Sequence, residues 1–157
     1  MSSYSEARLA GETVMTLGVL VTRRTHLRYL GPVITAAQRR GHGVVVIAQP
    51  VAAKRGDALM NGQEIKTFWP GVSVASSVPW WLDALVASDA SMPEATCRRV
   101  SVGQWYDDLW IRPPRTGGVI QTYISEWQRD QHAALWPGTK ATGPVVGWLP
   151  SDAAIPG

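Results

Sequence analysis

Apolar and polar positions along residues 13–50 follow the order of a strand, a helix and a second strand. Residues 13–22 form a near-continuous apolar run, residues 29–40 are amphipathic, and residues 44–48 are a β-branched run. Buried strands flanking an amphipathic helix predict a βαβ unit. We therefore expect a parallel sheet with helices packed on its faces.

The rest of the chain continues this alternation in shorter segments. Further strands are expected at residues 64–69, 83–89, 100–106, 119–125 and 142–148. Further helices are expected at residues 92–99 and from Ser125 to about residue 136, whereas residues 73–81 fit neither period. The prediction is an α/β, Rossmann-like fold: a mostly parallel sheet of six or seven strands with helices on both faces.

Domain organisation and compartment follow from length and composition. With 157 residues, 45% of them hydrophobic, the chain suits one domain at residues 13–149, between an N-terminal tail (1–12) and a linker or tail (150–157). The first twelve residues hold no apolar stretch, and no apolar run approaches the roughly 20 residues that span a bilayer. Cys97 has no second cysteine to pair with, which favours a reducing compartment. We expect a cytoplasmic protein, and association with the inner face of the membrane or with itself stays open.

Charge and motifs remove several function classes. The net charge of +3 is spread over short basic groups, unlike the concentrated basic face of a nucleic-acid binder, so no nucleic-acid partner is expected. The chain has no G-x-G-x-x-G after its first strand, no P-loop and no G-x-S-x-G elbow. Its three His and one Cys are far apart, so we expect no metal site.

His26 is the main candidate for chemistry. Parallel sheets bind ligands beyond the carboxyl ends of their strands, and His26 follows the first strand. An imidazole there accepts a proton from a hydroxyl near neutral pH when a carboxylate orients its other nitrogen. Asp89, Asp107 and Asp108 follow later strands at the same edge, and Asp89 and Asp107 are the expected catalytic partners. The alternative is that His26 is a solvated loop residue and that these Asp residues cap helices.

Other polar positions have simpler interpretations. Gly41 suits the left-handed position after a helix, so His42 is expected to cap or pack, and His132 has the same structural interpretation within its helix. Ser125 is expected to cap a helix with Glu126 in its first turn, and that helix end is also a candidate site for a hydroxyl-rich ligand.

Eight tryptophans are many for this length. Neighbours on a strand point to opposite faces, so the pairs Trp80-Trp81 and Trp105-Tyr106 are hard to bury completely. A ligand groove or a protein interface is therefore a candidate position for one or two of the tryptophans.

A family resemblance rests on the first βαβ unit. It is carried by Thr25-His26-Leu27, Gly31-Pro32 and Ala37-Gln38-Arg39-Arg40-Gly41-His42-Gly43-Val44-Val45-Val46-Ile47. These segments resemble the N-terminal half of GT-B glycosyltransferases. Many of those enzymes have a His after the first strand, a small residue and Pro at the helix entry, and an R-G-H-x-V run opening the second strand.

Later segments extend the resemblance over roughly residues 13–150. Residues 100–108, 123–130 and 141–144 are similar to segments of CDP-glycerol transferase and UDP-GlcNAc 2-epimerase relatives. Two departures stand out: Trp105 replaces the His of their Gln-His-Gly, and Pro144 comes one residue early.

The resemblance implies an acceptor-binding domain. A GT-B enzyme holds its nucleotide-sugar co-substrate mainly in a C-terminal domain, so this domain would bind no cofactor and would need a donor-binding half, in cis or as a separate chain. In that reading His26 is the general base of an inverting transfer to a saccharide or lipid-linked acceptor, and Thr25, Trp105, Ser125 and Glu126 line the acceptor site. The reading also expects an exposed His26 in a cleft, and it fails if His26 is fully buried against core residues.

Two alternatives remain open. One is a non-catalytic Rossmann-like binding or interaction module, recognised by a Trp-rich interface covering the strand ends. The other is a stand-alone small-molecule hydrolase, which would need a metal held by Asp89 and Asp107.

Overall fold

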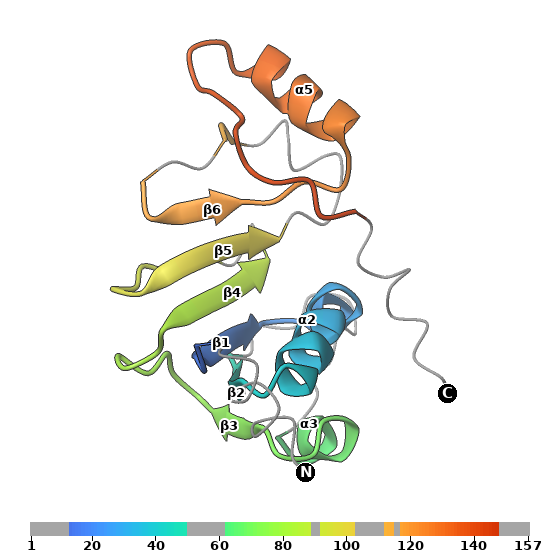
Figure 1. Cartoon of the computed structure of the whole chain (residues 1–157), viewed down its shortest axis with the longest axis vertical. Coiled ribbons are helices and arrows are strands. Elements are labelled where there is room, and N and C mark those ends of the chain that lie inside the picture. The colour runs from blue at the N-terminus through green and yellow to red at the C-terminus, as the bar shows by residue number, and fades with distance from the viewer. Residues whose placement is uncertain (1–12, 50–61, 89–91, 103–111, 115–116, 148–157) are drawn as a thin grey trace.

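Six strands form a single parallel sheet (Figure 1). The computed structural model describes residues 13–49, 62–88, 92–102, 112–114 and 117–147. Its strands are β1 (Thr16–Val21), β2 (Gly43–Ala48), β3 (Ser73–Ala75), β4 (Ala84–Ser88), β5 (Arg98–Val102) and β6 (Val119–Gln121). They lie in the order β3-β2-β1-β4-β5-β6, and every neighbouring pair is parallel. This confirms the α/β, Rossmann-like fold, with six strands in the described part of the chain.

Two helices cover one face of the sheet. Helix α2 (Leu27–Arg39) places Leu30, Ile34 and Ala37 against the strands, at the spacing that keeps apolar residues on one helix face. Helix α3 (Gly62–Phe68) adds Ile65 to the same core. The other face is covered in the described part by connecting segments, which supply Val78, Leu82, Met92, Ala95 and Cys97. Helix α5 (Glu126–Leu135) lies beyond β6 (Figure 1).

The first βαβ unit forms as expected from the pattern. The prediction of a strand, a helix and a strand is confirmed by β1, α2 and β2, whose ladder pairs Thr16 with Gly43 and Val21 with Ala48. Gly41 has a φ of 78°, the left-handed conformation expected after a helix end. His42 then accepts a hydrogen bond at Nδ1 from the Met15 amide at 3.2 Å, which ties the helix end to the start of β1.

Two short elements differ from the prediction. Residues 64–69 are not a strand but belong to α3 and the turn after it, because Ile65 and Trp69, four residues apart, are both buried on one helix face. The helix predicted at residues 92–99 is also wrong. Its described start is irregular, and its last two residues begin β5. The β-branched Val100 and Val102 favour a strand there.

The strand predicted at residues 142–148 is reduced to one bridge, between Tyr123 and Val145. The Tyr123 amide donates to the Pro144 carbonyl at 3.0 Å, and the Val146 amide donates to the Tyr123 carbonyl at 2.8 Å. The next rung of this parallel ladder would need an amide N–H from Pro144, which proline lacks. Among the described residues, the pairing of this segment is therefore limited to the bridge between Tyr123 and Val145.

Exposed aromatic side chains lie at the amino-terminal ends of the strands, whereas His26 lies at their carboxyl ends. Trp80 is 85% exposed and Trp81 51% exposed, just before the start of β4. The expectation that this pair is not fully buried is confirmed.

Candidate functional site

The strand order creates a switch point between β1 and β4. From β1 the chain proceeds to β2 on one side, and from β4 it proceeds to β5 on the other. The connections therefore leave the carboxyl ends of these neighbours in opposite directions, which opens a crevice in open α/β sheets. His26 follows β1 at this edge, as the sequence predicts.

A short turn brings His26 back over the end of β1. After Val21 the chain forms a 3₁₀ turn, η1 (Arg24–His26), closed by the His26 amide donating to the Arg23 carbonyl at 3.0 Å. His26 lies four residues after Thr22, and its Nδ1 is 3.2 Å from the Thr22 hydroxyl oxygen. The strand end and the turn together thus pair an imidazole with a hydroxyl.

His26 is buried, contrary to the exposed position expected from the sequence. Its exposed fraction is 5% and that of Thr22 is 7%. The neighbouring strand β4 also ends in a buried polar residue, Ser88, which is 1% exposed. The carboxyl ends of β1 and β4 and the turn after β1 thus carry two hydroxyls and one imidazole, and all three side chains are buried.

The Thr22–His26 bond is compatible with base chemistry in one tautomer. If Nδ1 carries the proton, it donates to Thr22 and Nε2 keeps the lone pair that a general base needs. In the other tautomer, the Thr22 hydroxyl donates to Nδ1 and Nε2 carries the proton. Thr22 thus takes the position relative to His26 that the sequence assigned to a carboxylate.

The outer rim of this site is basic. Arg23, Arg24 and Thr25 are exposed on the turn. Arg24 Nη1 lies 3.8 Å from Glu64 Oε2, with about half of each side chain exposed, so this ion pair contributes little to stability. Thr25, an expected substrate-binding residue, is exposed on the turn after β1.

Ser125 and Glu126 lie at the same sheet edge but away from His26. Three strand spacings separate the ends of β1 and β6, or about 14 Å. The Gln128 amide donates to Ser125 Oγ at 3.1 Å, and Gln128 Oε1 accepts from the Ile124 amide at 2.8 Å. Ser125 is thus the expected helix N-cap, in an arrangement close to a capping box.

The remaining predicted site residues, Asp89, Trp105 and Asp107, lie outside the described residues, as does Asp108. Among the described residues, no group of three or more His, Cys, Asp or Glu side chains is placed to hold a metal ion. Described helices are also all too short or too polar to cross a bilayer.

Sequence reasoning missed Thr22 as a hydrogen-bond partner of His26. A threonine ending an apolar run four residues before a His is a usable signal, because the turn after a strand brings such residues together. It also missed the surroundings of His132, which the structure places between two segments. His132 Nδ1 is 2.9 Å from the Tyr123 hydroxyl, and its Nε2 is 2.9 Å from the Arg112 carbonyl oxygen.

Comparisons with known proteins return no relative. No protein-family model matches the chain, and no curated protein or solved structure matches it significantly.

Proposed function

We propose that this chain is the acceptor-binding domain of a GT-B glycosyltransferase, active only together with a donor-binding half. The observation that carries the proposal is His26 at the β1–β4 switch point, hydrogen-bonded to Thr22. The sequence resemblance of residues 13–50 supports it independently, since it places a His after the first strand of that family.

The turn after β1 argues against a dinucleotide site in the same place. In dinucleotide-binding domains glycines in this turn let the backbone approach a pyrophosphate. Here the turn from Thr22 to His26 contains no glycine, and the His26 side chain is buried over the strand end. Recognition of an acceptor through side chains suits this turn better than recognition of a nucleotide through the backbone.

The proposed reaction assigns His26 a proton transfer. An acceptor hydroxyl that reaches Nε2 loses its proton to the imidazole. Its oxygen attacks the anomeric carbon of the sugar, and the nucleoside diphosphate leaves. Thr22 orients the ring by accepting a hydrogen bond from the Nδ1–H group. Because His26 is buried, an acceptor hydroxyl reaches Nε2 only when the groups packed around the ring move aside.

Reconstitution with a donor-binding half tests this proposal. The tagged chain is purified from its native cells, and any co-purifying protein is assayed with it for UDP release from UDP-glucose and UDP-N-acetylglucosamine. We expect release only when both halves are present.

His26→Asn, which keeps a polar atom near the Nδ1 position, is expected to lower the rate about 100-fold or more. His42→Asn is the matched control and is expected to keep the rate. Full activity of the His26→Asn variant together with its co-purifying protein would show that His26 is not the general base. If no co-purifying protein supports transfer with this chain, the proposed function is wrong.

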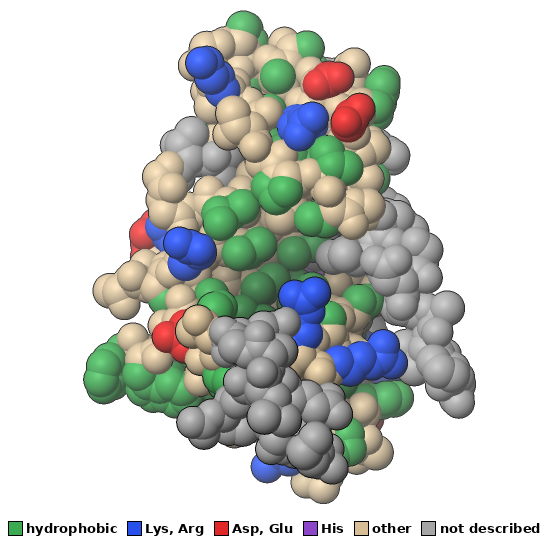
Figure 2. Space-filling view, in the orientation of Figure 1, with side chains coloured by type: hydrophobic (Ala, Val, Ile, Leu, Met, Phe, Trp, Pro, Cys, Tyr) green, Lys and Arg blue, Asp and Glu red, His purple; other side chains and the backbone are tan. Residues whose placement is uncertain are grey.

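The burial of His26 also favours a second candidate, a non-catalytic Rossmann-like interaction module. In this candidate the Thr22–His26 bond only stabilises the turn. Apolar side chains gather between α5 and α2 in Figure 2, and Ile120, Val145 and Val146 are each about 40% exposed. Equilibrium sedimentation of the chain separates the two candidates. A self-associating chain that loses association on Ile120→Asp supports the module, whereas a monomer with transfer activity beside a partner supports the transferase.

A further inference from the structure

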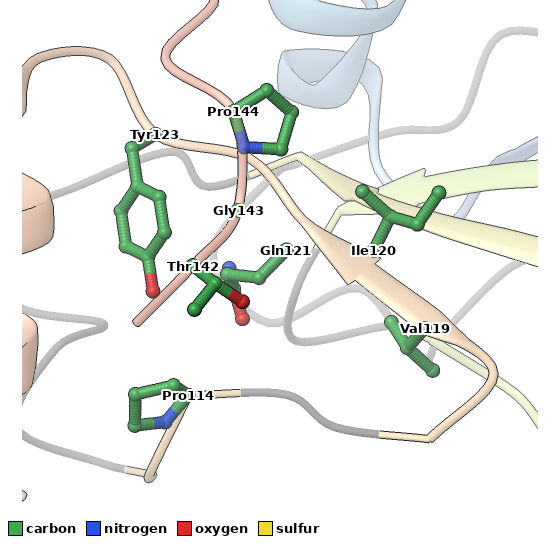
Figure 3. Close-up of a pocket in the computed structure, with 8 residues that line it drawn as sticks. All are labelled: Pro114, Val119, Ile120, Gln121, Tyr123, Thr142, Gly143 and Pro144. Carbon is green, nitrogen blue, oxygen red and sulfur yellow. The ribbon is translucent and has the colours of Figure 1, made fainter. Parts of the chain in front are cut away.

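A cavity of about 240 Å³ lies beside β6, the edge strand of the sheet, far from His26 (Figure 3). Its walls are β6, Tyr123, residues 142–144 and Pro114. This volume is many times that needed for one water molecule and just below the range of sites for drug-sized ligands. A ligand of monosaccharide size therefore fits it.

The backbone of β6 offers hydrogen-bonding groups towards this side. The Gly118 carbonyl accepts from the Arg99 amide, and the Thr122 amide donates to the Ser101 carbonyl. In a parallel ladder the backbone N–H and C=O groups of alternate residues point to the same neighbour. Those of Ile120 therefore point to β5, and those of Val119 and Gln121 point away from it, to the outer side of β6.

Two polar side chains add to this edge. Gln121 is 7% exposed and lines the cavity with its amide, which both donates and accepts. Thr142 lines the cavity from the other wall, and the polar ends of the two side chains point towards one another in Figure 3. The rings of Pro114, Tyr123 and Pro144 supply apolar walls, and none of the described residues that line the cavity is charged.

The shape of the edge excludes an added β-strand. Gly143 packs so closely on the Gln121 carbonyl that a Cβ at position 143 would collide with it. Pro144, the next residue, cannot donate to the ladder. An extended peptide running along β6 is therefore blocked at Gln121, whereas a compact ring is not.

Helix α5 holds the walls in place. Arg129 Nη1 donates to the Gly143 carbonyl at 3.4 Å. His132 Nε2 donates to the Arg112 carbonyl at 2.9 Å, two residues before Pro114. The bridge between Tyr123 and Val145 fixes the third wall. The cavity is thus preformed, as small-molecule sites usually are.

We propose that this cavity binds a neutral, hydroxyl-rich molecule of monosaccharide size. Hydroxyls of the ligand bond to the side chains of Gln121 and Thr142 and to the outward peptide group of Val119, and its C–H face packs on Tyr123 and the proline rings. The site is separate from His26 and stands whether or not the chain belongs to a glycosyltransferase. The same ring chemistry comes from a free monosaccharide or from the terminal sugar of a glycoconjugate.

Titration of the full chain, followed by ¹⁵N–¹H correlation spectra, tests the site. The probes are glucose, galactose, mannose and N-acetylglucosamine, each free and as its methyl glycoside, at millimolar concentrations. We expect at least one probe to shift the amides of Gln121, Tyr123, Thr142 and Gly143 saturably. Binding of the methyl glycoside as well as the free sugar identifies a glycoconjugate end. Binding of the free sugar alone identifies a monosaccharide.

Three variants decide whether the shifts come from this cavity. Thr142→Ala, at an exposed position, is expected to raise Kd about fivefold by removing one hydrogen bond. Gln121→Met, similar in shape, is expected to raise it tenfold or more. Thr67→Ala, an exposed threonine on α3, is the control and leaves Kd unchanged. Unchanged binding by Thr142→Ala, or the absence of saturable shifts at these amides with every probe, overturns the proposal.

Discussion

Replacing Tyr123 with Phe tests whether the Tyr123–His132 pair holds α5 against the sheet. Both side chains are buried, at 1% and 2% exposure, and their rings meet edge to face with centroids 5.7 Å apart. The Arg112 carbonyl can only accept, so His132 Nε2 carries the proton in that bond. In the neutral ring Nδ1 is then the acceptor, and the Tyr123 hydroxyl donates to it.

The expected loss of stability follows from this assignment. Phe keeps the ring packing but removes the donor, which leaves Nδ1 buried without its hydrogen-bond partner. An unsatisfied buried acceptor costs about 1–3 kcal/mol. For a chain of this size, about 2 kcal/mol corresponds to a lowering of Tm by about 4–8 °C.

Urea unfolding followed by tryptophan fluorescence measures this loss. We expect a lower midpoint with an unchanged slope, because the same surface is exposed on unfolding. A double-mutant cycle with His132→Leu supplies the control: on that background the effect of Tyr123→Phe should fall by about 1 kcal/mol. A loss below about 0.5 kcal/mol, or equal losses on both backgrounds, would refute the assigned hydrogen bond.

Three further predictions, each checked by thermal and urea unfolding, concern the packing and the helix ends. Gly18→Val should destabilise the chain by about 1–3 kcal/mol because a Cβ there would overlap Leu82, whereas Gly43→Ala has room and should change stability by less than about 0.5 kcal/mol; equal effects would contradict the close packing at Gly18. Gly41→Ala should lose about 1–2 kcal/mol because of its φ of 78°, and a neutral result would mean that the turn relaxes. Ser125→Ala should lose about 1 kcal/mol with its N-cap bond, and an unchanged Tm would show that the cap contributes nothing.

Local pattern was sufficient for the longer elements. The apolar run before Thr22 and the β-branched run from Val44 can only be buried as strands, and the helix between them makes the pair parallel. Gly41 and Ser125 mark helix ends because their chemistry acts within a few residues along the chain. Such signals can be recognised in the sequence because the two interacting residues are close to one another along the chain.

Short segments were less decisive. Residues 64–69 hold three apolar positions, Ile65, Phe68 and Trp69, and so short a segment fits a strand as well as a helix. The strand expected at residues 142–148 fails for a reason that appears only when Tyr123 is placed beside Pro144. The effect of a missing N–H depends on where that N–H would have pointed.

For the candidate site, the sequence by itself determined the element that carries His26 and the edge of the sheet where it lies. Only the tertiary structure decided that β1 and β4 are neighbours, that His26 is buried, and that β6, Tyr123 and residues 142–144 line a cavity. The period of apolar residues fixes local conformation, because it depends on neighbours along the chain. Burial and pairing depend on contacts between distant residues, and these are set by how the whole chain packs.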